Sequence, residues 1–277
     1  MFNTEDIYEV VIFSTGDTKA GTKMGKLQLK NTVDESVLNC ILWEETLNRF
    51  DSKIFRTGNL VRIVSATFNE KYNNCLVSAL ELVKEAKLGL EPAETKNYWT
   101  ELQDYIQKIQ NEKLRNFVSE MFSKYEDKFK IMPAAKLMHH NYVGGLLVHT
   151  VECCKFAQLN MEKFVYKPNK DNVYAACLLH DFGKIFEYTI DTETGLIDYA
   201  PGFKETWVSH SQYGFCICMN AGFNMVAKMI AAHHGRAEWD AIIDLNGKDL
   251  EPELYLLHFI DNLSAKFGKI NTRLLEE

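Results

Sequence analysis

The sequence lacks the features of several protein classes. No stretch of its 277 residues reaches the roughly 18–20 uninterrupted apolar residues that a membrane-spanning helix needs. The N-terminal segment MFNTEDIYEVVIF has acidic residues where a secretory signal peptide has a basic region, so we expect a cytoplasmic protein without a membrane partner. Internal repeats and low-complexity tracts are also absent from the sequence.

Cysteine pairs with the CxxC spacing of thiolate zinc sites are missing too. In a reducing compartment, we interpret the seven cysteines as small buried hydrophobic residues. There is no basic surplus either, because the net charge is −7 and most of the deficit lies after residue 88. The field of the whole protein therefore does not attract a polyanion, and local patches or bound metal ions would have to do so.

Histidine is absent from the first 138 residues. All eight histidines lie between His139 and His258. This segregation indicates that the second half of the chain uses them together.

Residues 1–88 have the composition and alternation of short strands. The expected strands are residues 7–13, 26–30, 36–43, 60–68 and 75–82, with a short helix at 44–50 before the fourth. This order of elements predicts an all-β OB-fold barrel that binds nucleic acid, with a generic small barrel as the alternative.

Aromatic and basic residues of this barrel are candidates to contact a single strand. Tyr72 is the strongest candidate, because it lies in a polar turn where core packing does not explain it. The candidates for base stacking are Phe13, Trp43, Phe68 and Tyr72, and those for phosphate contacts are Lys23, Lys26, Lys30 and Lys71.

The remainder of the chain has a helical pattern. Residues 89–97 contain Gly89 and Pro92 without apolar periodicity, which predicts a linker. From Tyr98 onward, apolar residues recur at spacings of three and four, which predicts an all-α domain over residues 98–277. Its expected helices include 146–162, 171–186, 209–221, 223–233 and 252–267, with a small hairpin inserted at 186–203.

Five segments place His or Asp within or beside apolar helical runs, where a lone polar group would be poorly solvated. A single histidine of this kind is more often a hydrogen-bonded core residue than a metal ligand. Five such segments in one domain favour a shared metal centre. The segments are HHNYVGGLLVHT (139–150), LLHDFGK (178–184), WVSH (207–210), AAHHG (231–235) and LHFIDN (257–262).

Imidazole nitrogens and carboxylate oxygens suit divalent ions such as Mn²⁺, Fe²⁺ or Zn²⁺. Asp181, beside His180, has two oxygens and can therefore bridge two ions. Two ions about 3.5–4 Å apart can activate a water and neutralise the oxygens of a phosphate under in-line attack. Lys184, about one helical turn beyond Asp181, could stabilise the developing charge on that phosphate. The alternative for Lys184 is a solvated cation at a helix end.

The series His149, His180-Asp181 and Asp261 resembles the H…HD…D signature of the HD superfamily of metal-dependent phosphohydrolases. The segment HDFGK is similar to the HD-x-G-K motif of that superfamily. An OB-like barrel before an HD domain, together with HHNYVGGLLVHT and LHFIDNLSAK, resembles the YhaM-type 3′→5′ exoribonucleases over nearly the whole chain.

This resemblance implies two metal positions. One ion would be held by His149, His180, Asp181 and Asp261. The second would share Asp181 and add His210 and His233. Of the adjacent pair, we favour His233 as the ligand and His234 as an outer-layer or substrate contact. His210 departs from the family pattern, because its WVSH context is less rich in glycine. The assignment of the second ion depends on this residue.

Three further histidines have two open interpretations each. His139 and His140 would line the substrate entrance or cap a helix. His258 would orient Asp261 or pack in the core. Gly144 and Gly145 would let the backbone pass close to the metal or substrate, or form a simple turn before the helix.

The sequence thus predicts a metal-dependent 3′→5′ exoribonuclease that hydrolyses phosphodiester bonds of single-stranded nucleic acid, RNA before DNA. We expect two divalent ions, Mn²⁺ before Fe²⁺, Mg²⁺ or Zn²⁺, and leave a homo-oligomer open. The alternatives are an HD phosphohydrolase of nucleotides, cyclic nucleotides or other small phosphate esters, and a catalytically inert nucleic-acid-binding module. The expected substrate contacts are Lys184, His234, His140, Tyr72 and Lys26, with Asp181 and Lys184 as catalytic residues.

Overall fold

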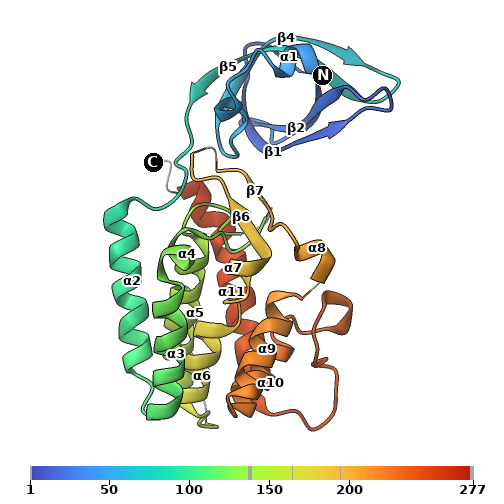
Figure 1. The fold of residues 1–277 in the computed structure, drawn as a ribbon. Coiled ribbons are helices and arrows are strands. Elements are labelled where there is room, and N and C mark those ends of the chain that lie inside the picture. The colour runs from blue at the N-terminus through green and yellow to red at the C-terminus, as the bar shows by residue number, and fades with distance from the viewer. Residues whose placement is uncertain (1, 137–138, 164, 194, 207, 275–277) are drawn as a thin grey trace. The chain divides into compact units, whose positions relative to one another are not determined.

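The computed structural model describes residues 2–136, 139–163, 165–193, 195–206 and 208–274. The chain divides into two compact units (Figure 1). One comprises Met1–Leu88 with Asp191–Leu196, and the other comprises Gly89–Ile190 with Ile197–Glu277. Among the described residues, no helix combines the length and the apolar character that crossing a membrane requires.

The first unit is a closed five-stranded barrel with the strand order β1-β2-β3-β5-β4. Neighbouring strands are antiparallel except β3 and β5, which pair in parallel, and β1 closes the barrel against β4. The short helix α1 (Glu44–Leu47) precedes β4, as predicted. The strands are β1 (Ile7–Asp17), β2 (Lys23–Asn31), β3 (Val37–Trp43), β4 (Leu60–Asn69) and β5 (Asn74–Lys84), with a 3₁₀ turn η1 at Ser52–Phe55. The predicted OB-like barrel is confirmed.

Alternation along these strands decides which aromatic residues the barrel leaves exposed. Phe13 stacks on Phe55 with ring centroids 4.2 Å apart, and Phe68 packs against the same core. Their prediction as base-stacking residues is therefore wrong, because both rings take part in core packing. Trp43 and Tyr72 are 49% and 65% exposed, so both rings are accessible.

The second unit is helical, with one small two-stranded sheet. The predicted helix 171–186 is interrupted, since α6 ends at Leu179 and α7 begins at Lys184. The predicted hairpin is present as β6 (Tyr188–Ile190) and β7 (Ile197–Tyr199). The helices are α2 (Pro92–Gln107), α3 (Glu112–Lys124), α4 (Glu126–Ile131), α5 (Gly145–Met161), α6 (Lys170–Leu179), α7 (Lys184–Glu187), α8 (Phe203–Thr206), α9 (His210–Asn220), α10 (Asn224–Ala232) and α11 (Pro252–Leu274), with a 3₁₀ turn η2 at Ala237–Trp239.

The prediction that residues 89–97 form a linker is wrong for most of that range. Pro92 is the first residue of α2, a position where its missing N–H costs nothing. The Glu94 side chain accepts a hydrogen bond from the Glu91 backbone N–H, which completes a helix start. Gly89 forms a β-bridge with Val143, and the Leu90 N–H donates to the Val143 carbonyl. This segment is thus tied to the helical unit.

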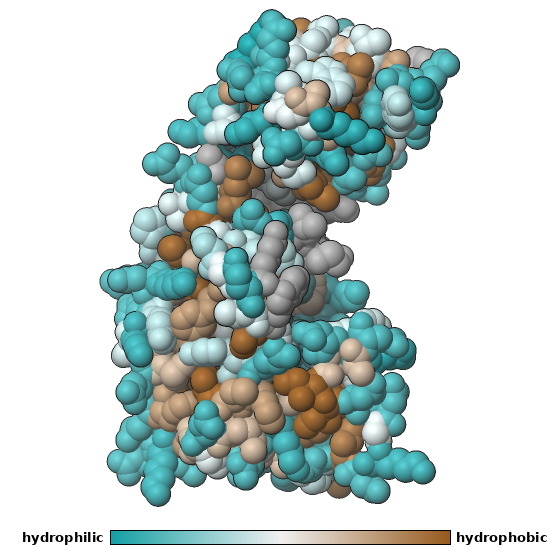
Figure 2. All heavy atoms as spheres, turned by 45° about the vertical axis from the view of Figure 1, so that its right-hand side comes forward, coloured by the Kyte–Doolittle hydropathy of each residue, from teal (hydrophilic) through white to brown (hydrophobic). Residues whose placement is uncertain are grey.

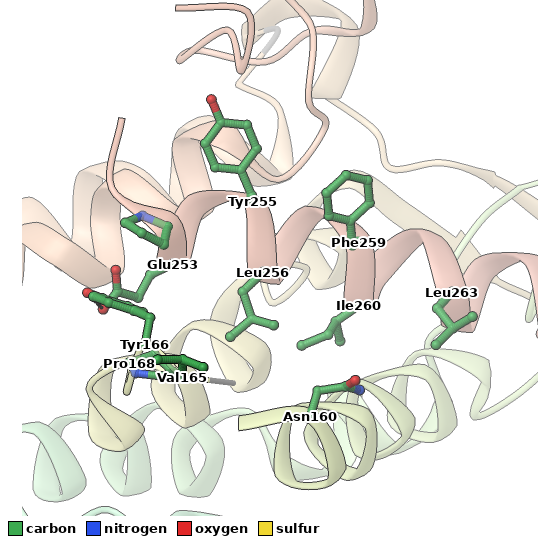
Figure 3. A pocket seen from close by; sticks show the side chains of 11 residues that line it. Asn160, Val165, Tyr166, Pro168, Glu253, Tyr255, Leu256, Phe259, Ile260 and Leu263 are labelled. Carbon is green, nitrogen blue, oxygen red and sulfur yellow. Dashed lines mark hydrogen bonds between the residues drawn. The ribbon is translucent and has the colours of Figure 1, made fainter. Parts of the chain in front are cut away.

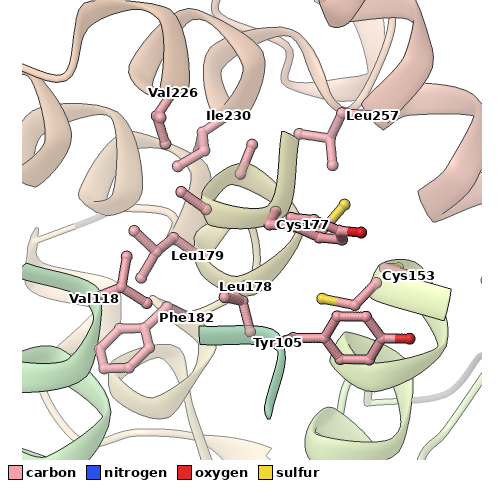
Figure 4. Packing of buried hydrophobic residues seen from close by; sticks show 14 of the residues in the cluster. Tyr105, Val118, Cys153, Cys177, Leu178, Leu179, Phe182, Val226, Ile230 and Leu257 are labelled. Carbon is pink, nitrogen blue, oxygen red and sulfur yellow. The ribbon is translucent and has the colours of Figure 1, made fainter. Parts of the chain in front are cut away.

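The core of the helical unit surrounds α5 and α6 (Figure 4). Residues 173–179 of α6 are all buried, which explains their unbroken apolar sequence. Phe182 follows directly after Asp181, and its ring packs edge-on against Phe122 at 5.2 Å and stacks with Phe129 at 5.7 Å. The turn that carries His180 and Asp181 is therefore anchored in the core on both sides. All seven cysteines are free, and only Cys216 is exposed.

One face of the helical unit carries hydrophobic patches between hydrophilic side chains (Figure 2). An apolar pocket of about 450 Å³ lies along α11, where Leu256, Phe259 and Ile260 line it (Figure 3). None of the predicted metal ligands lines this pocket, although Asp261 follows Ile260 directly. The pocket is therefore separate from the predicted site.

Candidate metal centre

The six predicted metal ligands belong to five helices or directly follow them, and they meet in the interior of the helical unit. His149 belongs to α5, His180 and Asp181 follow α6, His210 is the first residue of α9, His233 follows α10, and Asp261 belongs to α11. His149 and His180 are fully buried, and Asp181 is 2% exposed. The convergence of these side chains was the central prediction from the sequence.

The first group of ligand atoms surrounds one point. His149 Nε2 lies 3.2 Å from His180 Nε2 and 3.3 Å from Asp181 Oδ2. Asp261 Oδ1 is 3.2 Å from His149 Nε2 and 3.9 Å from His180 Nε2. Two donors bound 2.0–2.1 Å from one ion at adjacent positions are about 3.0–3.4 Å apart. The spacing of the group is close to that of metal ligands.

Hydrogen bonds on the opposite ring nitrogens fix which atoms face this point. His180 Nδ1 is 2.9 Å from the Cys177 carbonyl, which only accepts, so Nδ1 carries the proton. The Ser264 hydroxyl donates to Glu152 Oε2 at 2.7 Å and therefore accepts from His149 Nδ1 at 2.9 Å. Both Nε2 atoms then present lone pairs to each other. Lone pairs converging at 3.2 Å call for a cation between them, which is the arrangement of metal-binding histidines.

A second group lies on the other side of Asp181. His210 Nε2 is 3.4 Å and His233 Nε2 is 3.8 Å from Asp181 Oδ1. His233 Nδ1 is 2.6 Å from the Ile230 carbonyl and so carries the proton, which leaves Nε2 as a bare donor. Within the described part of the chain, His233 Nε2 is buried and has no hydrogen-bond partner.

The carboxylate of Asp181 thus faces both groups, with Oδ2 toward the first and Oδ1 toward the second. A histidine could not do this, because each ring nitrogen binds one ion along one direction. The donor set consists of imidazole nitrogens and carboxylate oxygens, which fits two divalent ions of the first transition row.

His234 has a larger role than the sequence suggested. Its Nε2 lies 3.0 Å from His210 Nε2, and the ligand atoms of His210, His233 and His234 all lie within 4.8 Å of one another. Both adjacent histidines therefore face the second position, and the expected choice between them does not arise. We propose that His234 is a ligand of the second ion.

The position of His210 depends on two residues that the sequence analysis did not identify. Glu187 Oε2 accepts hydrogen bonds from His210 Nδ1 at 2.7 Å and from the His210 backbone N–H at 3.2 Å. A Cβ on Gly183 would lie 2.6 Å from His210 Cα, so only glycine lets α9 begin this close to the HDFGK turn. Trp207 of the WVSH segment lies outside the described residues.

Lys184 lies beside the carboxylate and not in solvent. Its Nζ is 2.6 Å from Asp181 Oδ2, and the residue is 8% exposed. The alternative of a solvated cation at a helix end is therefore wrong. Lys184 is placed to offset negative charge at Asp181 and at any phosphate bound next to it.

The other predicted histidines have structural contacts. His140 is 1% exposed, and its Nε2 faces Glu152 Oε2 at 3.2 Å, so its prediction as a substrate contact is wrong. His258 Nδ1 donates to the His233 carbonyl at 2.7 Å, so it supports the second group and does not orient Asp261 through a hydrogen bond.

Gly144 and Gly145 allow two backbone segments to pass close to each other, and the metal ligands do not require them. Gly144 has φ +85°, and a Cβ on Gly145 would lie 1.9 Å from the His140 carbonyl oxygen. Together they form the turn before α5 while the loop that carries His140 passes against it.

Two further groupings of possible ligands are excluded by chemistry. Cys153 Sγ is 3.8 Å from His149 Nε2, but burial raises the pKa of this thiol to about 12, so it remains protonated and is a poor ligand. His139, His140 and His149 also lie close together. His149 has one free nitrogen, Nε2, and the first group already uses it.

The protonation states of His180, His233 and Asp181 suit metal binding. Burial lowers the pKa of His180 and, together with His234, holds that of His233 well below its usual value. Burial would raise the pKa of Asp181, but the Lys184 ammonium and nearby imidazoles hold it well below the usual range. Burial would lower the pKa of His149, but Cys153, Asp181 and Asp261 raise it. In the metal-free protein, a proton on His149 takes the place of the first cation.

Glu187 gives a test of the second position. We expect Glu187→Ala to weaken binding of the second Mn²⁺ by about 10- to 100-fold, because His210 loses the acceptor that fixes its orientation. Glu187→Gln keeps an acceptor and should lose less. Mn²⁺ titration by calorimetry measures both sites. Glu238→Ala, which removes an exposed acid that pairs with Arg236, is the control and should leave both sites unchanged.

His234 gives a test by pH. Burial, followed by the charge of His210, lowers its pKa from 6.5 to about 4. The unfolded chain therefore binds a proton between pH 6.5 and 4 that the folded chain does not, and acidification destabilises the metal-free protein. Removing this group by His234→Gln should make the loss of unfolding free energy from pH 7 to pH 5 smaller by about 2 kcal/mol. Urea unfolding with a chelator measures it, and an identical loss in both proteins would contradict the assignment.

Comparison with known proteins agrees with this geometry. Residues 146–266 match the family model described as HD domain. The chain is 29% identical over 250 residues to a 3′-5′ exoribonuclease YhaM from Geobacillus sp. (strain WCH70), covering 84% of this chain and 74% of the relative. It is 26% identical over 230 residues to a protein of the same name from Oceanobacillus iheyensis, covering 79% and 67%. No solved structure matches the chain significantly. Residues 146–266 are thus similar to HD domains, and the matches together support a metal-dependent hydrolase of the HD superfamily.

Proposed function

We propose that the protein is a 3′→5′ exoribonuclease that hydrolyses the phosphodiester bonds of single-stranded RNA with two divalent ions, Mn²⁺ before other metals. The observation that carries the proposal is the buried Asp181 carboxylate, whose two oxygens face separate groups of imidazoles. The first position would use His149, His180, Asp181 and Asp261, and the second would use Asp181, His210, His233 and His234.

Different residues of the chain have different roles in phosphodiester hydrolysis. When bound, the two ions supply positive charge for the phosphate oxygens and lower the pKa of a water. Asp181 would be a ligand of both ions, and its contact with Lys184 Nζ at 2.6 Å keeps its carboxylate ionised. Lys184 also adds a positive charge beside the phosphate, where charge develops during attack. The surrounding apolar core excludes bulk water and strengthens these interactions.

The direction of cleavage and the choice of RNA rest on the relatives. Both similar proteins are 3′-5′ exoribonucleases by name, and each alignment covers about four-fifths of this chain or more. An alignment of that extent is longer than the HD domain and the residues after the barrel combined, so it includes part of the barrel. The same activity is therefore the best proposal for this chain.

The barrel supports a guiding role for residues 1–88. The Tyr72 ring is 65% exposed, and Lys71 Nζ lies 5.3 Å from its centre. An exposed ring with a cation beside it is suited to stack on a base and to hold the neighbouring phosphate. Lys26 on β2 is exposed as well and would contact the phosphate backbone of the RNA.

Two alternative functions remain distinguishable. A hydrolase of nucleotides or other small phosphate esters would use the same metal centre without the barrel. An inert nucleic-acid-binding module would not need a ligand set in which every member is present and converges. The experiments below separate these possibilities from the proposed activity.

Asp181→Ala tests the metal chemistry. With Mn²⁺, the parent should shorten a 5′-labelled single strand stepwise and release the terminal nucleotide of a 3′-labelled strand at once, and a chelator should stop both. The variant should be slower by on the order of 100-fold or more, because both ions lose a shared ligand. Circular dichroism checks that it is folded. Equal rates in parent and variant would remove Asp181 from the mechanism, and degradation from the 5′ end would contradict the direction.

Tyr72→Ala tests the barrel. We expect KM for a strand of about 20 nucleotides to rise roughly tenfold, because one stacked base loses its partner. Cleavage of a dinucleotide, which has no bases beyond the two at the scissile bond, should not change. Val33→Ala removes another exposed barrel side chain, 85% accessible, and should change neither substrate. If Tyr72→Ala left both substrates unaffected, the small-ester alternative would gain support.

A further inference from the structure

The adjacent histidines His139 and His140 have different surroundings, and His140 is fixed in place. Its backbone has φ +49°, a left-handed conformation that is uncommon for residues other than glycine. A Cβ on Gly145 would lie 1.9 Å from the His140 carbonyl oxygen, and one on Gly268 would lie 2.2 Å from the His140 ring. The His140 carbonyl accepts from the Ala134 N–H at 3.0 Å. Two glycines thus leave room for this residue.

Glu152 connects His140 to the metal centre. Its Oε2 lies 3.2 Å from His140 Nε2 and 2.7 Å from the Ser264 hydroxyl, which accepts from His149 Nδ1. The segment that carries His139 and His140 is therefore held relative to His149 through buried polar contacts. This fixed arrangement allows His139 to be positioned without a contact of its own.

His139 points toward the first metal position. Its ring is perpendicular to that of His140 and lies 5.3 Å from the His149 ring, centroid to centroid. Within the described residues, His139 Nε2 is buried and has no hydrogen-bond partner. A buried polar atom without a partner is costly, and such an atom at a functional site indicates a missing contact.

His139 does not belong to the ligand set of the first ion. A ring nitrogen of His139 lies within 4.8 Å of His149, but the group formed by His149, His180 and Asp261 does not include it. A residue that lies beside the ligands without being one of them can reach an oxygen of the substrate that lies next to the ion.

We propose that His139 is a substrate-binding residue whose Nε2–H donates a hydrogen bond to an oxygen of the terminal nucleotide's phosphate, on the first-metal side of Asp181. The proposal rests on the phosphodiesterase function proposed above and adds a contact that the metal ligands do not supply. His140 and Glu152 are the positioning residues that hold His139 toward the phosphate.

The test uses the full chain loaded with Mn²⁺ and adenosine 5′-monophosphate as the probe, with affinity measured by calorimetry. His139→Gln and His139→Asn form a matched pair, because the Gln amide N–H falls near the place of Nε2–H and the Asn amide falls near that of Nδ1. We expect Gln to bind the probe within about threefold of the parent and Asn to bind about tenfold more weakly. His139→Ala should match Asn. Each variant should retain as many Mn²⁺ ions per chain as the parent, counted by mass spectrometry.

Equal affinity in the parent and His139→Ala, or equal affinity in Gln and Asn, would overturn the contact. Loss of an ion in His139→Ala would also overturn it, since His139 would then be a ligand. RNA shortening by the parent is measured separately. A parent that binds the probe but leaves RNA intact contradicts the exoribonuclease proposal, whereas the variants decide the His139 contact.

Discussion

The structure of the helical unit depends on holding two carboxylates and a set of imidazoles inside an apolar core. Asp181 is 2% exposed and lies among His149, His180, His210 and His233. Ionised groups in such a place are stable only when opposite charges and hydrogen bonds surround them. In the metal-free chain, Lys184 and a proton on His149 supply that charge, and divalent ions would supply more of it. The same feature therefore constrains the fold and provides the chemistry.

A layer of contacts behind the ligands decides where each donor atom points. Carbonyls hold the Nδ1 atoms of His180 and His233, Glu187 holds that of His210, and Ser264 holds that of His149. Each contact leaves Nε2 free to face the centre. This uniform use of the outer nitrogen is the physical reason why side chains from separate helices act as one site.

Glycines next to helix ends make the close approach of these elements possible. Gly183 leaves room for the backbone of His210, Gly235 for the ring of His258, and Gly145 for the carbonyl of His140. Any Cβ at these positions would push a ligand or its support away from the centre. These three glycines thus help to shape the candidate metal centre although none of them is a predicted ligand.

Much of this architecture could be predicted from the sequence alone. Strand alternation before residue 88 and helical periodicity after it depend on local patterns, so the barrel, the helical unit and the hairpin followed from them. The ligand candidates followed from His and Asp within apolar runs, since buried polar groups need partners. Local pattern also misled: Pro92 and Gly89 suggested a linker, although the chain there begins α2 and pairs with Val143.

Tertiary structure alone decided the finer roles. Whether Phe13 packs inward on Phe55, whether His234 faces His210, and which of His139 and His140 turns toward the centre all depend on contacts between residues distant in sequence. Glu187 carried no signal in the sequence because its partner, His210, lies 23 positions away. Residue types and spacing were enough to predict a metal site built from imidazoles and carboxylates. The direction in which each ring points was set only when the helices packed, because a ring's orientation depends on the hydrogen-bond partner behind it.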